Sequence, residues 1–194
     1  MSRLFPKVAD KITPVFLCCD LQEKFAARIP RFNDAVFEAN RFSKVAEELK
    51  APFIVTEQYP KGLGHTVSDI KLPSTAPPPF AKSAFSMITP EVEKAIGSHK
   101  HFVLWGIEAH VCVQQTVDDL ISADRDNRVW IVSNGTFSQH EVDRLDALEW
   151  FRHTPGVAVT TSESLLMQFI RGKDHPNFKF ISGLLRERQP SERQ

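Results

Sequence analysis

The amino-acid sequence predicts an α/β fold in which a parallel sheet is wrapped by helices on both faces. Two observations lead to this prediction. Apolar runs of strand length alternate with segments of helical periodicity along most of the chain, which is typical of repeated strand–helix–strand units. The first run, residues 13–20, is almost continuously apolar and ends at Asp20, as expected of a central strand that is covered on both faces.

Four further apolar runs of strand length predict the rest of the sheet. They are rich in valine, isoleucine and aromatic residues, which are common in strands. The expected strands lie at residues 52–56, 101–106, 128–133 and 157–160.

Two longer segments have the spacing of amphipathic helices. Residues 33–50 carry apolar side chains three or four positions apart, from Val36 to Leu49. Residues 111–123 repeat this spacing with Val113, Val117 and Leu120, so a second helix is expected to start beside Cys112.

Start signals predict three shorter helices. Thr89 followed by Pro90 is a typical helix N-terminus and predicts a helix to about residue 96. Residues 138–141 have the spacing of a capping box ahead of a helix to about residue 152, and residues 160–163 repeat it ahead of 165–170. Helices therefore separate most of the expected strands.

Two segments depart from this alternation. Residues 59–80 are proline-rich and irregular, and long loops of this kind often close over a site. The tail at 186–194 is charged and is expected to fray. We expect one domain over residues 1–194, with its core at about 13–185 and a short flexible N-terminus.

Composition limits the classes of function. The 194 residues hold 24 basic and 24 acidic side chains, so no overall charge recruits nucleic acid or an anionic membrane. No apolar run approaches a membrane span, and the N-terminus lacks the apolar stretch of a secretory signal. Three cysteines form neither a disulfide framework nor a zinc-ligand pattern. These features favour a cytoplasmic location, with a mitochondrial one as the alternative.

Cys112 is the first candidate for a chemical role. It follows the glycine turn at Gly106, in what should be the first helical turn. Unpaired N–H groups and the helix dipole favour a thiolate there and lower the pKa of such thiols. The alternative is a buried cysteine that packs as a small apolar residue.

Asp20 and Lys82 are the next candidates. Ligands of open parallel sheets bind beyond the carboxyl ends of the strands, where both Asp20 and the Cys112 turn are expected. A carboxylate can accept a thiol proton, and a lysine can stabilise the resulting anion. Lys82 lies among small and apolar residues, where a lysine needs a partner. The alternatives are that Asp20 caps a turn and that Lys82 is exposed.

Four motifs in order resemble the isochorismatase-like cysteine hydrolases, and most closely their isochorismatase-domain branch. The motifs are residues 19–25 (CDLQEKF), 56–64 (TEQYPKGLG), 82–87 (KSAFSM) and 106–113 (GIEAHVCV), and the resemblance covers about 13–185. It implies a Rossmann-like, three-layer α/β/α fold with about six parallel strands. It also implies a catalytic triad of Asp20, Lys82 and Cys112. The likeness extends to a protein of kinetoplastid parasites labelled a mitochondrion-associated ribonuclease.

The resemblance also implies how the triad acts. In amidases of the family the aspartate takes the thiol proton, the lysine stabilises the charged pair, and the cysteine attacks a carbonyl to form an acyl-enzyme. A non-proline cis peptide, here Ile107–Glu108, would direct the backbone N–H groups of Glu108 and Cys112 toward one point as an oxyanion hole.

Departures from the family pattern limit what is carried over. Nicotinamidases hold a metal with an Asp-x-His pattern after the second strand, where this chain has Glu57 and Gln58. Glu57 and His65 are conceivable ligands, but we expect no metal and no other cofactor. Cys18 and Cys19 are expected to be structural. The substrate pocket is expected to include Phe25, Tyr59, Leu63 and His110, although His110 also fits an ordinary core or surface histidine.

Three functions remain open on this basis. The first is a thiol-dependent hydrolase of a small amide or related carbonyl compound. The second is a ribonuclease, which neutral composition and an acyl-transfer triad make the weaker alternative. The third is a binding module on a hydrolase fold. Family members usually self-associate, so a homo-oligomer is expected.

Overall fold

The computed structural model describes residues 13–192 and contains one six-stranded sheet in the order β3-β2-β1-β4-β5-β6. Every neighbouring pair of strands is parallel. The strands are β1 (Val15–Cys19), β2 (Phe53–Gln58), β3 (Phe80–Lys82), β4 (His101–Gly106), β5 (Arg128–Thr136) and β6 (Val157–Thr160). The predicted parallel α/β sheet is therefore confirmed.

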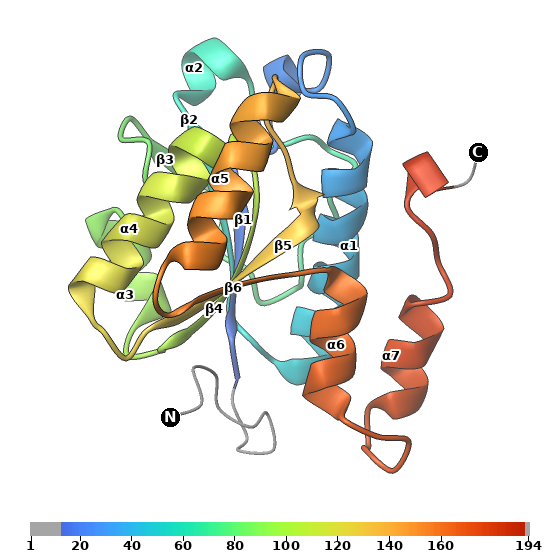
Figure 1. Cartoon of the computed structure of the whole chain (residues 1–194). Helices are drawn as coiled ribbons and strands as arrows, with labels where there is room; N and C mark the ends of the chain where they lie inside the picture. The colour runs from blue at the N-terminus through green and yellow to red at the C-terminus, as the bar shows by residue number, and fades with distance from the viewer. Residues whose placement is uncertain (1–12, 193–194) are drawn as a thin grey trace.

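Helices cover both faces of this sheet (Figure 1). One face carries α1 (Phe32–Leu49), α6 (Ser162–Ile170) and α7 (Phe178–Leu184). The other carries α3 (Pro90–Ile96), α4 (Gln114–Ala123) and α5 (Glu141–His153). Because all five residues of β1 are buried, side chains that alternate along the strand enter two separate core layers. Cys18 lies in the layer under α1, and Cys19 lies in the layer under α4.

Several shorter elements were not predicted. β3 ends at Lys82, α7 follows α6, and α2 (Pro60–Leu63) lies inside the segment expected to be irregular. Three short helical turns complete the described chain: η1 (Glu23–Phe25), η2 (Ala109–Val113) and η3 (Pro190–Glu192). A three-residue strand and a four-residue helix are too short to produce a periodic pattern, so tertiary contacts determine whether they form.

Two of the predicted helix starts need correction. Thr89 caps α3 as expected, and its hydroxyl accepts from Val92 N. α6 is capped by Thr161, one residue later than the Thr160 capping box predicted. The capping box at Ser138 is wrong: α5 begins at Glu141 after His140, and no side chain caps it. Ser138 is instead buried and bonded elsewhere, as described below.

The tail does not fray over residues 186–192. Gln189 is buried and its amide donates to Glu38 Oε1 and to Asn134 O, both at 2.7 Å. The Ser191 hydroxyl donates to Asp34 Oδ2 at 2.6 Å. These bonds hold the tail against α1. The expected flexible N-terminus lies largely outside the described residues.

The candidate site is expected at the carboxyl edge of the sheet. β1 lies between β2 and β4, and the order of the strands reverses there, so a crevice is expected beyond the ends of β1 and β4. Asp20 follows β1 and the Cys112 turn follows β4. Within residues 13–192, no helix combines the length and apolar character needed to cross a membrane.

Candidate active site

Asp20 is held in a fixed orientation at the end of β1. Its backbone is left-handed, with φ 52°, a conformation that aspartate tolerates better than most residues. The carboxylate is 1% exposed, and each of its oxygens has a partner. Thr56 Oγ1 donates to Oδ1 and Lys82 Nζ donates to Oδ2, both at 2.7 Å. Asp20 is therefore a buried, oriented carboxylate.

Lys82 is the buried cation of the site. Besides Asp20, its Nζ donates to Gln58 Oε1 at 2.7 Å and to Phe85 O at 2.8 Å, and lies 3.3 Å from Ala84 O. Burial alone lowers the pKa of Lys82, but the neighbouring Cys19, Asp20 and Cys112 outweigh burial and hold the pKa above its ordinary value. Lys82 therefore stays charged, and the partner expected from the sequence is confirmed. It acts as a fixed charge, because its protons are already shared among these oxygens.

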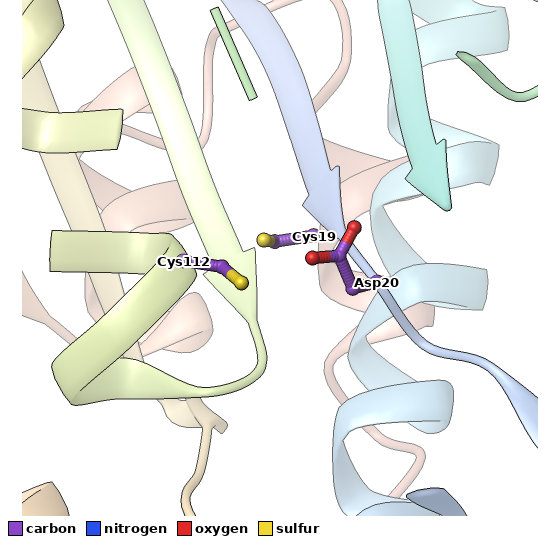
Figure 2. Close-up of side chains that lie close together, drawn as sticks. All are labelled: Cys19, Asp20 and Cys112. Carbon is purple, nitrogen blue, oxygen red and sulfur yellow. The ribbon is translucent and has the colours of Figure 1, made fainter. Parts of the chain in front are cut away.

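Cys112 lies opposite Asp20 across the end of the sheet (Figure 2). Its Sγ, the Cys19 Sγ and an Asp20 carboxylate oxygen all lie within 4.8 Å of one another. Cys112 is 7% exposed, whereas Cys18 and Cys19 are fully buried. The structure thus brings Asp20, Lys82 and Cys112 together, as predicted.

The local structure around Cys112 differs from the expected first turn of an α-helix. Residues 109–113 form a π-helical turn, η2, and α4 begins only at Gln114. Val113 N donates to Glu108 O at 3.2 Å, five residues back. The Thr116 hydroxyl donates to Cys112 O at 2.6 Å and accepts from Met87 N. Hydrogen bonds at Cys112 O and at Val113 N therefore hold the backbone of Cys112 in this widened turn.

Gly106 allows this turn to approach β1 closely. Its φ is +125°, and a Cβ atom there would lie 2.2 Å from Cys19 O. No larger residue fits without moving the backbone. Ile107 N donates to the same Cys19 carbonyl at 3.0 Å. The peptide bond Ile107–Glu108 is cis in the structure, where the family resemblance implies it.

The loop after β5 is hydrogen-bonded to the turn that carries Cys112. Ala109 N donates to Phe137 O at 2.9 Å and lies 3.1 Å from Ser138 Oγ. The Glu108 carboxylate accepts from the backbone and side-chain amides of Gln139. Ser138, misread as a helix cap, thus holds the backbone that carries the expected oxyanion donors Glu108 and Cys112.

Sequence reasoning also missed Thr56 and Gln58, which orient Asp20 and Lys82. Both follow the rule that identified Asp20, because they lie at the carboxyl end of an expected strand. The polar residues at and just after the end of the run at 52–56 were a signal for them as candidates, although not for their contacts. Ser138 carried no comparable signal, because it lies five residues after the end of the strand expected at 128–133.

The four residues expected in the substrate pocket have different surroundings. Tyr59 is 60% exposed, and its N–H donates to Lys82 O at 2.9 Å, so it lies at the edge of the site. Phe25 and Leu63 are half-buried on η1 and α2, which pack together. His110 Nδ1 lies 3.0 Å from Ser138 Oγ, and its ring is partly exposed. Their contact with a substrate stays a prediction.

The residues considered as metal ligands already have other partners. Glu57 accepts from Thr66 N, Thr66 Oγ1 and His65 Nδ1 at 2.7–3.1 Å. Partial burial raises the pKa of Glu57, but these hydrogen bonds outweigh it and keep the pKa below its ordinary value. Among the described residues, one group offers three ligand atoms: Cys19, Asp20 and Cys112. These three residues do not form a suitable site for a metal cation, because the Asp20 carboxylate is already ion-paired with the Lys82 ammonium.

The strand order and the helical layers on both faces define the three-layer α/β fold of the isochorismatase-like hydrolases. The sequence profile of the isochorismatase domain matches residues 14–164, and the chain belongs to the isochorismatase family.

Relatives and solved structures agree with this assignment. "Isochorismatase domain-containing protein 1" of Danio rerio is 43% identical over 181 residues, covering 92% of this chain and 62% of the relative. This chain thus spans less than two thirds of that relative's length. A "hypothetical protein" from Trypanosoma cruzi has a TM-score of 0.91 and 37% identity, over 97% of this chain and 98% of its own. The "putative MAR1 ribonuclease" from Leishmania major has a TM-score of 0.90 and 42% identity, over 97% and 98%.

Proposed function

We propose that this protein hydrolyses a small amide or related carbonyl compound, with Cys112 as the nucleophile. The observation that carries the proposal is the placement of Cys112 Sγ within 4.8 Å of the Asp20 carboxylate, which is itself oriented by Thr56 and Lys82. A nucleophile, a base and a group that orients the base are the parts that acyl transfer requires.

The reaction proceeds in two halves. Asp20 accepts the thiol proton, and Cys112 Sγ attacks the substrate carbonyl. The N–H groups of Glu108 and Cys112 stabilise the oxyanion. The intermediate collapses to a thioester as Asp20 returns the proton to the leaving amine. A water molecule, deprotonated by Asp20, then hydrolyses the thioester and frees Cys112. Lys82 keeps its positive charge throughout and stabilises Asp20 whenever Asp20 is ionised.

The test compares the alkylation rate of Cys112 in folded and unfolded protein. Iodoacetamide is applied at neutral pH, and each cysteine is followed by peptide mass spectrometry. An activated Cys112 reacts faster in the folded protein than in urea, although it is only 7% exposed when folded. Cys18 is the internal control, because burial and the charge of Asp20 raise the pKa of its thiol. Cys112→Ala is expected to abolish turnover of an amide panel with the fold intact.

Two results would reject this mechanism. One is folded Cys112 that reacts more slowly than unfolded Cys112, since that describes a merely buried thiol. The other is amide turnover that survives Cys112→Ala.

A ribonuclease is the second candidate, favoured by the name of the similar Leishmania major structure. Against it stand the equal numbers of basic and acidic residues and a site lysine already surrounded by oxygens. RNA cleavage that persists in Cys112→Ala and weakens with added salt would support this candidate over the hydrolase.

Self-association is a further part of the proposal. Val142 and Leu145 are exposed one helical turn apart on α5, and a second copy could cover them. A structural neighbour from Escherichia coli is described as an octameric hydrolase, but at 19% identity it supports the fold alone. Sedimentation analysis tests this: a monomer across the concentration range would reject it.

A further inference from the structure

A second thiol beside Cys112 has no part in the proposed reaction. Cys19 ends β1 and is fully buried, and its Sγ lies within 4.8 Å of Cys112 Sγ. Figure 2 shows the two side chains extending toward each other from β1 and from the turn after β4. Both belong to the core layer under α4, whereas Cys18 points into the layer under α1.

The backbone itself enforces this proximity. Cys19 is paired with Gly106 in the register of β1 and β4. Gly106 has no side chain to separate the strands, and Ile107 N is bonded to Cys19 O at 3.0 Å. Six residues after Gly106, Cys112 is anchored by the Thr116 hydroxyl. The two cysteines therefore project from backbone positions that these contacts hold in place.

We propose that Cys19 and Cys112 form an oxidation site, in which hydrogen peroxide converts the two thiols to a reversible disulfide and switches the hydrolase off. The proposal rests on the proposed function, because it takes Cys112 as the reactive thiol. Cys19 is the resolving thiol. Closure needs the sulfurs to approach from within 4.8 Å to about 2.05 Å, the length of a disulfide bond.

The chemistry balances in two steps. The Cys112 thiolate attacks one peroxide oxygen and the O–O bond breaks, which gives a sulfenic acid and a hydroxide that takes up a proton to become water. Cys19 sulfur then attacks the sulfenic sulfur, the S–O bond breaks, and the Cys19 proton leaves with the hydroxyl as water. Two thiols lose two electrons to one peroxide molecule, and two waters form.

The surroundings of the two thiols set the order of these steps. Burial, the hydrogen bond with Cys112 and the charge of Asp20 raise the pKa of Cys19 well above its ordinary value. Cys19 is also fully buried, so peroxide meets the slightly exposed Cys112 first. Asp20 lies within 4.8 Å of both sulfurs, so it can pass the Cys19 proton to the departing hydroxyl as the disulfide forms.

The consequence is protection of the nucleophile. A sulfenic acid without a neighbouring thiol is oxidised further to sulfinic acid, which thiols do not reduce. A disulfide with Cys19 removes the nucleophile but returns it on reduction. Cys19 therefore decides whether oxidation of Cys112 is reversible.

The experiment follows the fate of Cys112 after peroxide treatment of the reduced 194-residue chain. Wild type, Cys18→Ser and Cys19→Ser are compared, with Cys19→Ala in case a buried serine prevents folding. Free thiols are blocked, and peptides are mapped without reduction. Wild type and Cys18→Ser should yield a linked Cys19–Cys112 peptide and recover most Cys112 labelling after dithiothreitol. The Cys19 variants should lose most of that labelling irreversibly, with sulfinic acid on Cys112.

The inference is overturned if peroxide gives no linked peptide and the same irreversible loss of labelling in wild type and both Cys19 variants. A Cys18–Cys112 link would overturn it as well. Alkylation of the reduced protein separates this result from failure of the proposed function. Rapid Cys112 alkylation without a disulfide rejects only the oxidation site, whereas a Cys112 inert to both reagents rejects both.

Discussion

Replacing Lys82 with methionine tests whether the site depends on a buried ion pair. The Lys82–Asp20 bond is 2.7 Å long, and the two side chains are 0% and 1% exposed. Methionine keeps most of the apolar length of lysine but removes the charge and the hydrogen bonds to Asp20, Gln58 and Phe85. Asp20 would then be a buried carboxylate that keeps Thr56 as a donor but has lost its cation.

The expected loss follows from this burial. Removing one partner of a buried ion pair costs about 3–5 kcal/mol of unfolding free energy, because the remaining charge is uncompensated. Domains have about 5–15 kcal/mol in total, so the variant is expected to fold with much lower stability. Lys100 and Asp124 provide a matched control, with the same residue types at 2.6 Å but 44% and 38% exposed. Lys100→Met should change stability far less, because solvent screens that pair.

Urea unfolding at neutral pH measures both variants, and a double variant completes the cycle. Asp20→Asn combined with Lys82→Met removes both charges, so its loss should be smaller than the sum of the single losses. The reasoning is refuted if Lys82→Met costs no more than Lys100→Met. Strict additivity in the cycle would refute it too, since that result means no coupling between Asp20 and Lys82.

Two further predictions concern the turn that carries Cys112. Gly106→Ala should cost about 1–3 kcal/mol for the positive φ alone, and more because its Cβ would meet Cys19 O at 2.2 Å. Gly183→Ala, in α7 with nothing within 4 Å, should be neutral or stabilising in the same urea titration, and equal effects would contradict the packing argument. Ser138→Ala removes a buried hydrogen-bonding hydroxyl and should cost about 1–3 kcal/mol. It should also slow Cys112 alkylation; an unchanged rate would show that Ser138 does not position the turn.

Five strands of the sheet and two members of the candidate site could be predicted because burial leaves a local pattern. Strands such as β1 and β4 are covered on both faces, so they appear as continuous apolar runs. The point where such a run ends in a polar residue or a glycine then marks the carboxyl edge of the sheet. Asp20 and Cys112 follow from that rule. Lys82 was identified from its apolar neighbours, and its roles beyond the ion pair came from the family resemblance.

The amino-acid sequence by itself determined the alternation of strands and helices, the two core layers and the candidate residues at the strand ends. These features follow from periodic burial, which is visible in the order of residues close together in the chain. Only the tertiary structure decided that Ser138 clamps Ala109, that Thr56 and Gln58 orient Asp20 and Lys82, and that Cys19 faces Cys112. Each of these contacts joins segments far apart in sequence. They depend on strand register and on a widened turn after Gly106, which no local pattern encodes.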